Sequence, residues 1–220
     1  MITHDRLVVI NHPLVNHKLA LLRKKNTPGI IFRQCVREIG LLEAYEVTKQ
    51  IRTHEVTVET PLAVTKGQSF GGAEPVIVPI LRSGLCLLDP FLELIPTASV
   101  GHLGMARDEE THIAKEYYAK MPPHIEQKQV FIVDPMLATG GSLIDAIKNL
   151  RNRGVKDLYA AVMVASPEGI KAVLDADDEI ILYTCAVDEG LNEDAYIVPG
   201  LGDAGDRIYG TLDTPVEGVF

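Results

Sequence analysis

The sequence lacks tryptophan, holds only three cysteines and contains no long apolar run. Cys35, Cys86 and Cys185 lie far apart in apolar surroundings, without a Cys-x-x-Cys or Cys/His cluster. This pattern argues against a disulfide framework and a zinc site, and it favours three reduced thiols. No apolar run approaches the roughly eighteen residues of a membrane helix, and the first ten residues lack the core of a signal peptide. We therefore expect a cytoplasmic protein without a membrane partner.

Positive charge is also scarce. Lys and Arg number 21 against 30 for Asp and Glu, so the formal net charge is −9. A protein that binds nucleic acid through a broad basic face has the opposite balance, and we expect no nucleic-acid partner. Phosphate ligands stay possible, because a few arginines and loop amides reverse the field locally. The length of 220 residues suffices for one large α/β domain.

The most informative segment that is present covers residues 130–142, VFIVDPMLATGGS. A short apolar run ends in Asp134, a glycine-rich loop follows, and residues 143–152 have the apolar spacing of a helix. Two adjacent glycines let backbone N–H groups converge on an anion at a helix N-terminus, where Thr139 and Ser142 add hydroxyl donors. We predict a phosphate-binding loop, with Asp134 at the sheet end where α/β proteins bind ligands.

Other phosphate motifs do not fit this segment. No lysine follows the glycines, as a nucleotide-triphosphate P-loop requires, and no Gly-x-Gly-x-x-Gly opens the helix, as a dinucleotide site requires. The alternative is a glycine-rich turn without a ligand. The acid on the preceding apolar strand makes that alternative less favoured.

Two further segments point to ligands. Residues 196–210, YIVPGLGDAGDRIYG, contain four glycines and a proline, which exclude a regular helix or a central strand. We expect a shaped loop whose backbone approaches a flat ligand; the alternative is a surface turn cluster. Residues 78–84, VPILRSG, place Arg82 between a buried strand and a helix. Its planar fork suits phosphate, although a surface ion pair is the alternative.

These segments together resemble the type I phosphoribosyltransferases. The loop Ala138–Ser142 after an acid-bearing strand is similar to that family's loop for 5-phosphoribosyl 1-diphosphate. The family usually carries two adjacent acids, whereas here Asp134 is followed by Pro135, as in the uracil phosphoribosyltransferase branch. Residues 196–210 are similar, almost residue for residue, to the uracil-binding loop of that branch. The resemblance spans nearly the whole chain.

The resemblance implies the fold and the reaction. It implies a single α/β domain over residues 1–220, with a mostly parallel sheet covered by helices, a mobile hood at about 104–128 and a small base-binding cap. It implies a pentosyl transfer from 5-phosphoribosyl 1-diphosphate to uracil, which gives UMP and diphosphate in pyrimidine salvage. Mg²⁺ is the implied cofactor, held mainly by the substrate rather than by a cluster of side chains.

The resemblance also implies residue roles. Arg82 and Arg107 would contact the leaving diphosphate, and Asp203 would lie near both ligands, with its role open between substrate, metal and base. Without the resemblance, we would interpret Arg107 as a solvated charge on a loop. Uracil would meet Ile197, Gly202, Asp203 and Ala204. The remaining phosphoribosyl contacts would be Asp134, Pro135, Met136, Leu137, Ala138, Thr139, Gly140, Gly141 and Ser142.

Apolar periodicity along the chain predicts alternating strands and helices, and hence one parallel sheet covered by helices. The expected strands are residues 7–10, 54–60, 75–81, 98–103, 130–133, 158–165 and 180–187. The expected helices are residues 13–25, 32–51, 85–94, 143–152 and 168–174. By resemblance, the first two helices and the C-terminal glycine loop form the cap, over one sheet edge.

Some alternatives stay open. Lys18, Arg23 and Arg33 either pair with acids, which we favour, or bind an effector phosphate such as that of GTP, to which some family members respond. Residues 54–60 could reach a partner in a homodimer or homotetramer, and residues 212–220 have no assigned role. The rivals are an RNA-binding pyrimidine regulator of the same fold, which needs a basic surface, and a purine phosphoribosyltransferase, which needs a different base pocket.

Overall fold

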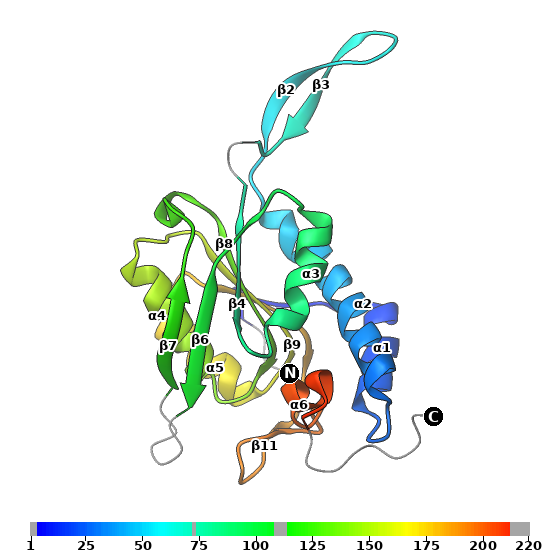
Figure 1. The fold of residues 1–220 in the computed structure, drawn as a ribbon, viewed down its shortest axis with the longest axis vertical. Coiled ribbons are helices and arrows are strands. Elements are labelled where there is room, and N and C mark those ends of the chain that lie inside the picture. Colours follow the sequence, from blue (N-terminus) through cyan, green and yellow to red (C-terminus); the bar gives the residue numbers. More distant parts are fainter. Residues whose placement is uncertain (1–3, 72–73, 108–113, 212–220) are drawn as a thin grey trace.

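A mostly parallel sheet of eight strands forms the centre of the molecule (Figure 1). The computed structural model describes residues 4–71, 74–107 and 114–211, with residues 106–107 and 114–116 described by their backbone alone. The strands of this sheet are β1 (Leu7–Val9), β4 (Val76–Leu81), β5 (Ser99–Val100), β6 (His102–Arg107), β7 (Ala114–Lys120), β8 (Val130–Leu137), β9 (Leu158–Ala165) and β10 (Ile181–Val187).

The strand order is β1-β10-β9-β8-β4-β6-β7, and β5 also pairs with β4. All of these pairs are parallel except β6–β7. The central strands are near-continuous apolar runs, because a sheet covered on both faces buries every side chain. Val76, Ile77 and Val78 of β4, for example, have no exposed surface. The predicted parallel sheet is therefore confirmed.

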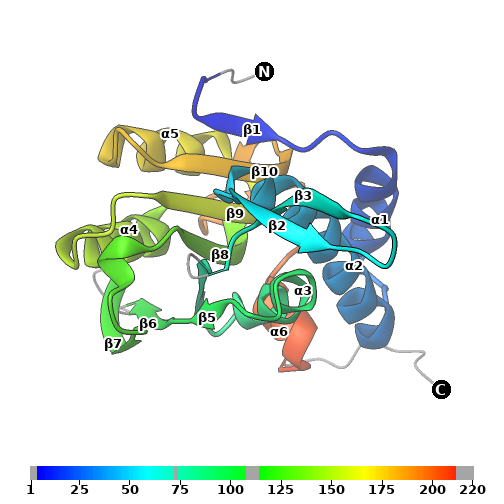
Figure 2. The same cartoon turned by 90° about the horizontal axis from the view of Figure 1, so that it is seen from above.

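Helices cover both faces of the sheet, as Figure 2 shows from above. On one face lie α1 (Pro13–Arg23), α2 (Gly29–Val47), α3 (Leu85–Leu94) and the short α6 (Ala204–Tyr209), around a core that includes Phe32, Phe91 and Phe131. On the other face lie α4 (Gly141–Asn152) and α5 (Pro167–Ala176), around a core that includes Ile132, Ile147 and Leu150. None of the helices in the described ranges is long and apolar enough to cross a membrane.

The first two helices differ from expectation in their position. We expected them to cap one edge of the sheet, but α2 packs against β9, β10 and α3 and so covers one face. The second helix also begins and ends earlier than predicted, at Gly29 and Val47. The wrong edge position follows from relying on the resemblance, since periodicity says which helix face is buried but not against which strand it packs.

A two-stranded hairpin projects away from this body (Figure 1). It pairs β2 (His54–Glu59) with β3 (Val64–Ser69), and most of its residues are exposed. The sequence predicts β2 but not β3, because VTKGQS is polar and contains a glycine. Such a strand is defined by its partner rather than by burial.

Residues 104–128 are predicted to interrupt the alternation of strands and helices, but their described part mostly extends the sheet. β6 pairs with the C-terminal end of β4, where Leu81 lies opposite Gly104. β7 then pairs with β6 in the antiparallel direction. The exposed Tyr117 ring lies directly over Gly104, where a Cβ would be 2.5 Å from the ring. The acidic stretch 108–113 lies outside the described residues, and the mobility of the hood stays a prediction.

Candidate active site

The site begins where β4 and β8 end side by side. Arg82 follows β4 directly, across a cis Leu81–Arg82 peptide bond. β8 is longer than predicted and continues to Leu137, so Asp134 lies within the strand. The hydroxyl of Ser83 donates a hydrogen bond of 2.7 Å to Oδ1 of Asp134. The segments of Arg82 and Asp134 thus meet at one end of the sheet, as the sequence predicts.

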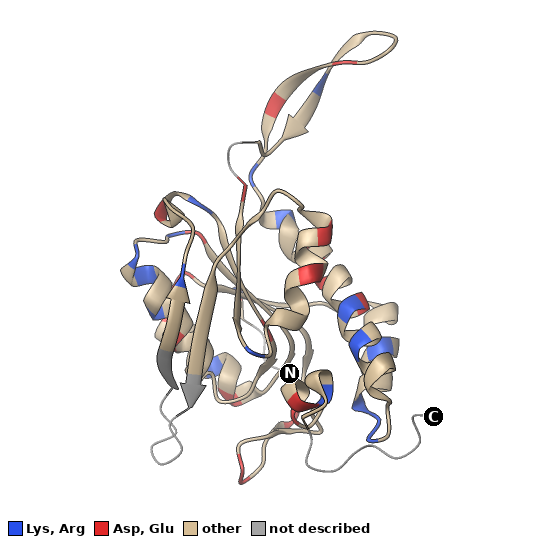
Figure 3. Cartoon of the chain, in the orientation of Figure 1, with Lys and Arg blue, Asp and Glu red and all other residues tan. Residues whose placement is uncertain are grey.

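Asp134 is unusual among the residues of the sheet. It is the one charged residue on β4, β8, β9 and β10, whereas most charged residues lie on helices and loops (Figure 3). Burial raises its pKa to about 7, against the lowering effect of the Ser83 hydrogen bond. A carboxyl group placed here at the cost of desolvation is well suited to accept hydrogen bonds from a ligand.

The glycine-rich loop lies directly beyond this carboxyl. Gly140 has a φ of 88° and precedes α4, which begins at Gly141. A small cavity of about 90 Å³ is lined by this loop and its neighbours, namely Asp134, Met136, Leu137, Ala138, Thr139, Gly140, Gly141, Ser142, Leu143 and Val162. The N-terminus of α4 opens toward an anion placed there.

The first turn of α5 supports the loop from behind. The Ser166 hydroxyl donates a 2.6 Å hydrogen bond to the Ala138 carbonyl and accepts one of 2.8 Å from the Gly169 amide. A Cβ on Gly169 would lie 2.2 Å from the same Ala138 oxygen. Only glycine allows α5 to pack so close to this backbone.

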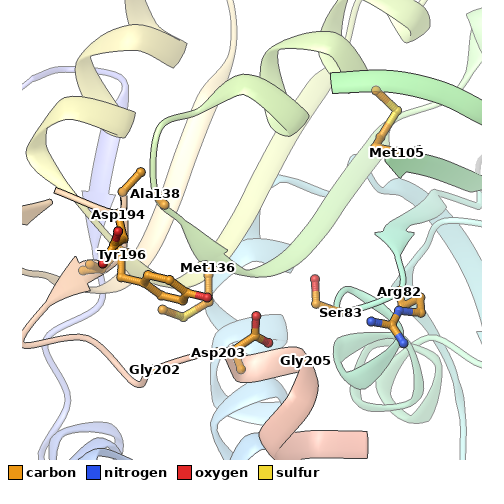
Figure 4. A pocket seen from close by; sticks show the side chains of 13 residues that line it. Arg82, Ser83, Met105, Met136, Ala138, Asp194, Tyr196, Gly202, Asp203 and Gly205 are labelled. Carbon is orange, nitrogen blue, oxygen red and sulfur yellow. The ribbon is translucent and has the colours of Figure 1, made fainter. Parts of the chain in front are cut away.

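A larger cavity of about 520 Å³ adjoins the loop. Arg82, Asp203 and Tyr196 come from three segments of the chain and surround it (Figure 4). Its lining residues are Arg82, Ser83, Met105, Met136, Ala138, Asp194, Ala195, Tyr196, Ile197, Gly202, Asp203, Ala204 and Gly205. Met136 and Ala138 line both cavities, so the two form one continuous cleft.

The segment 197–205 is shaped by special backbone positions. The Val198–Pro199 peptide is cis, and Gly200 has a φ of 58°. A Cβ on Gly200 would lie 2.1 Å from the Ile197 carbonyl oxygen, so this turn requires glycine. Asp203 then caps α6 by accepting a 2.8 Å hydrogen bond from the Asp206 amide, and its side chain is exposed toward the cavity.

Most of the predicted site residues therefore meet in one cleft, and two do not. Pro135 is buried in β8 and lines neither cavity. Arg107 ends β6 at the same sheet end, but its side chain lies outside the described residues. Sequence reasoning missed Ser83 and Tyr196, although both belong to segments that it singled out. The signal for Ser83 was its place next to Arg82, opposite a buried acid.

Metal-ligating side chains are sparse in this cleft. Within the described ranges, no group of three or more His, Cys, Asp or Glu residues has the arrangement to hold a metal ion. Asp203 still offers one carboxylate beside the cavity. One or two carboxylates suffice for Mg²⁺ when substrate phosphates supply other ligands. The donor set thus fits a Mg²⁺ ion that arrives with a phosphorylated substrate.

Comparisons with known proteins show which family the chain is similar to. A family model described as uracil phosphoribosyltransferase matches residues 9–211. The chain is 52% identical over 207 residues to the uracil phosphoribosyltransferase of Clostridium beijerinckii, covering 94% of this chain and 99% of that one. It is 50% identical over 203 residues to the enzyme of the same name from Enterococcus faecalis, covering 92% and 97%.

Solved structures are similar as well. A protein from Aquifex aeolicus superposes with a TM-score of 0.87 at 38% identity, covering 94% of this chain and 100% of that one. A hypoxanthine-guanine phosphoribosyltransferase from Bacillus anthracis has a TM-score of 0.51 at 15% identity, covering 73% and 80%. The second likeness shows a shared fold only.

Proposed function

Because the chain belongs to the uracil phosphoribosyltransferase family, we propose that the cleft beyond β4 and β8 is the active site of that transferase. The enzyme transfers the phosphoribosyl group of 5-phosphoribosyl 1-diphosphate to uracil and releases UMP and diphosphate. The observation that supports this site best is the continuity of the two cavities. An anion loop opens onto one cavity and a glycine-shaped segment onto the other, which suits a sugar phosphate next to a flat base.

The phosphoribosyl group would span the smaller cavity. Its 5-phosphate would bind the loop Ala138–Ser142 at the N-terminus of α4. A ribose hydroxyl would donate to Asp134, whose other hydrogen-bond donor is Ser83. The diphosphate would extend toward Arg82, together with Arg107 of the hood. Two planar guanidinium groups suit the clustered phosphate oxygens.

Mg²⁺ would accompany the diphosphate, held by its oxygens and by Asp203. When bound, the ion neutralises part of the phosphate charge. The Asp203 carboxylate is exposed beside the cavity and keeps its orientation through the Asp206 amide. This arrangement supports a metal or substrate role for Asp203 more than that of a base.

Uracil would lie in the larger cavity, against Ile197 and with its edge at Gly202, Asp203 and Ala204. Uracil offers two carbonyl acceptors and two N–H donors along its edge, so backbone amides and carbonyls can read it. The left-handed φ of 70° at Gly202 turns the backbone there. The Tyr196 ring also faces this cavity (Figure 4) and offers an apolar surface.

Catalysis would be mainly electrostatic and positional. Breaking the bond at the anomeric carbon builds positive charge on the ribose and negative charge on the departing diphosphate. Arg82 and Arg107 stabilise the negative charge, while the loop and Asp134 keep the sugar in place. If the hood segment 104–120 closed over the cleft, it would exclude water, which otherwise hydrolyses the activated sugar.

Other properties belong to the same proposal. A cytoplasmic location accords with the free thiols of Cys35, Cys86 and Cys185. A homodimer or homotetramer accords with the projecting hairpin, where Leu62 and Val64 are 96% and 69% exposed. The same proposal takes residues 1–220 as a single domain.

A GTP effector receives no support from the N-terminal cations. Lys18 pairs with Glu38, and Arg23 pairs with Asp188. Arg33 donates a 3.1 Å hydrogen bond to the Ile208 carbonyl. The favoured prediction that these side chains pair with acids therefore holds for Lys18 and Arg23, whereas Arg33 binds a carbonyl instead. Activity measured with and without GTP tests the effector itself.

The decisive experiment measures diphosphate release from 5-phosphoribosyl 1-diphosphate and Mg²⁺, with and without uracil. We expect uracil-dependent release that falls steeply in Arg82→Ala and Asp134→Ala. Release with hypoxanthine or orotate in place of uracil tests the other base specificities. An RNA shift assay tests the alternative that the protein is an RNA-binding regulator. Folded wild-type protein that binds the sugar substrate but releases no diphosphate with any base would contradict the proposal.

A further inference from the structure

A buried ion pair connects two distant parts of the chain behind the larger cavity. Arg23 lies in the last turn of α1, and Asp188 follows β10 directly. The two guanidinium nitrogens of Arg23 donate to both carboxylate oxygens of Asp188, at 2.8 and 2.6 Å. The Asp188 side chain is only 3% exposed. The pair is thus bidentate, with a buried carboxylate and a partly exposed guanidinium group.

Both partners also bind the backbone of Gly200. Nη1 of Arg23 donates to the Gly200 carbonyl at 3.1 Å, and the Gly200 amide donates to Oδ2 of Asp188 at 2.8 Å. One residue therefore has its donor and its acceptor fixed by a single ion pair. Gly200 stands two residues before Gly202, where the segment that lines the cavity resumes.

A second arginine fixes the next carbonyl. Nη1 of Arg207 donates to Leu201 at 2.7 Å, and Nη2 donates to the Lys24 carbonyl at 2.8 Å. Its guanidinium lies 4.2 Å from the Phe32 ring centroid. Two successive carbonyls, at positions 200 and 201, are therefore held against the end of α1. The anchoring stops directly before the residues that face the ligand.

The position of this ion pair argues for more than stability. A buried ion pair contributes little net stability compared with apolar residues of the same volume, because desolvation offsets the attraction. Its geometry, however, defines the place of Gly200 in three dimensions. Neither Arg23 nor Asp188 lines the cavity, so the pair acts on the ligand only through the backbone.

We propose that Arg23 and Asp188 are positioning residues for uracil, which clamp Gly200 and thereby set where Gly202, Asp203 and Ala204 meet the base. This inference rests on the proposed function. The phosphate loop and Arg82 belong to other segments and are not touched by the clamp. Loosening it therefore weakens the recognition of uracil more than that of 5-phosphoribosyl 1-diphosphate, which meets the clamped segment only at Asp203.

The test compares Arg23→Lys with the wild-type enzyme. A lysine keeps the charge but cannot bind both Asp188 oxygens and the Gly200 carbonyl in one plane. We expect the KM for uracil to rise roughly tenfold, with the KM for 5-phosphoribosyl 1-diphosphate within about twofold and a smaller change in kcat. Asp188→Asn is the second variant, in case the first fails to fold.

The chain offers a matched control. Arg151 and Asp177 form another bidentate, half-buried pair, at 2.7 and 2.8 Å, away from the cleft. Arg151→Lys should lower the melting temperature without changing either KM. Its normal kinetics would separate a loss of stability from a loss of positioning.

Two outcomes would overturn the inference. One is a folded Arg23→Lys or Asp188→Asn enzyme in which both KM values rise equally. The other is an unchanged uracil KM in either variant. Failure of the proposed function is a different result, since wild-type protein would then lack uracil-dependent diphosphate release.

Discussion

The two halves of the cleft are built in different ways. The phosphate half, from Asp134 to Ser142, is one continuous strand, loop and helix start. The base half, around residues 197–204, is held by Arg23 from a segment more than 170 residues earlier in the chain. A local segment places its own backbone donors, whereas in the base half one distant arginine fixes the backbone.

The two faces of the sheet beneath these halves also differ in how they treat buried polar groups. Behind the phosphate half, the buried Ser166 hydroxyl both donates and accepts. On the face that carries α1 and α2, Glu43 has no exposed surface. Within the described residues, its two carboxyl oxygens are the buried side-chain atoms without a hydrogen-bond partner. The buried hydroxyl behind the phosphate half thus has its hydrogen-bond partners, whereas the buried carboxyl on the other face has none among the described residues.

The largest expected effect comes from this contrast. Burial raises the pKa of Glu43 to about 8, from an ordinary value of 4.5. Between those two values the folded protein keeps a proton that the unfolded chain releases, so stability falls as pH rises. We expect Glu43→Gln to remove about 3.5 kcal/mol of the fall in unfolding free energy between pH 5 and 8. The slope is at most about 1.4 kcal/mol per pH unit and is smaller near each of the two pKa values.

Urea unfolding at several pH values measures this effect. Glu46→Gln is the control, because Glu46 lies on the same helix but is partly exposed and paired with Lys49. Equal pH slopes for wild type and Glu43→Gln would show that Glu43 has a polar partner or water in solution. The contrast between the two faces would then disappear.

A second prediction concerns a variant that disturbs the phosphate half through α5, which packs against the loop. In Gly169→Ala the new Cβ would lie 2.2 Å from the Ala138 carbonyl, so α5 or the loop must shift. A displacement near 1 Å can lower activity about 100-fold. Because the loop holds the sugar phosphate with which uracil must react, we expect kcat/KM to fall by that factor for uracil and for 5-phosphoribosyl 1-diphosphate alike.

The control for this variant adds the same methyl group where space exists. In Gly29→Ala, on α2, the nearest atom to the new Cβ would be 3.5 Å away. The measurements are the steady-state kinetics and the melting temperatures of Gly169→Ala and Gly29→Ala, each compared with wild type. A loss confined to uracil in Gly169→Ala would mean that the two halves are coupled and not separate.

The same contrast explains what could be predicted from the sequence. The phosphate half was predictable, because strand, acid, glycines and helix follow one another within a few residues. Even there the end of β8 was placed too early, since Asp134 and Pro135 are poor strand formers. Pairing with β9 as far as Leu137 overrides their propensity.

The base half could be recognised but not built from the sequence. The glycines of 196–210 predict a shaped loop, yet no local pattern says what holds it. Arg23 was expected to pair with an acid, but Asp188 lies 165 residues away. The sequence did not predict the burial of Glu43 without a partner either. Helical periodicity indicates which face of a helix is buried, but it does not show which polar side chains on that face find a hydrogen-bond partner.

The smallest predicted effect concerns the junction of the two halves. Ser83 follows Arg82 in the chain, and its hydroxyl donates to Asp134. This hydrogen bond lowers the pKa of Asp134, which burial raises to about 7. Its removal in Ser83→Ala should raise that pKa further. The ionised carboxylate is the form that accepts a hydrogen bond from the ribose hydroxyl. The rise of kcat/KM for 5-phosphoribosyl 1-diphosphate with pH should therefore occur at higher pH in the variant.

A pH profile of kcat/KM reports the pKa values of the free enzyme and so measures this shift. Near pH 7 we expect a decrease of at most about tenfold in Ser83→Ala, since one hydrogen bond to a charged group is lost. The decrease should vanish at high pH, where the carboxyl is ionised in both enzymes. Ser83→Thr keeps the hydroxyl and should keep the wild-type profile. An equal decrease at every pH would instead mean that Ser83 contacts the substrate itself, which would join the two halves at one side chain.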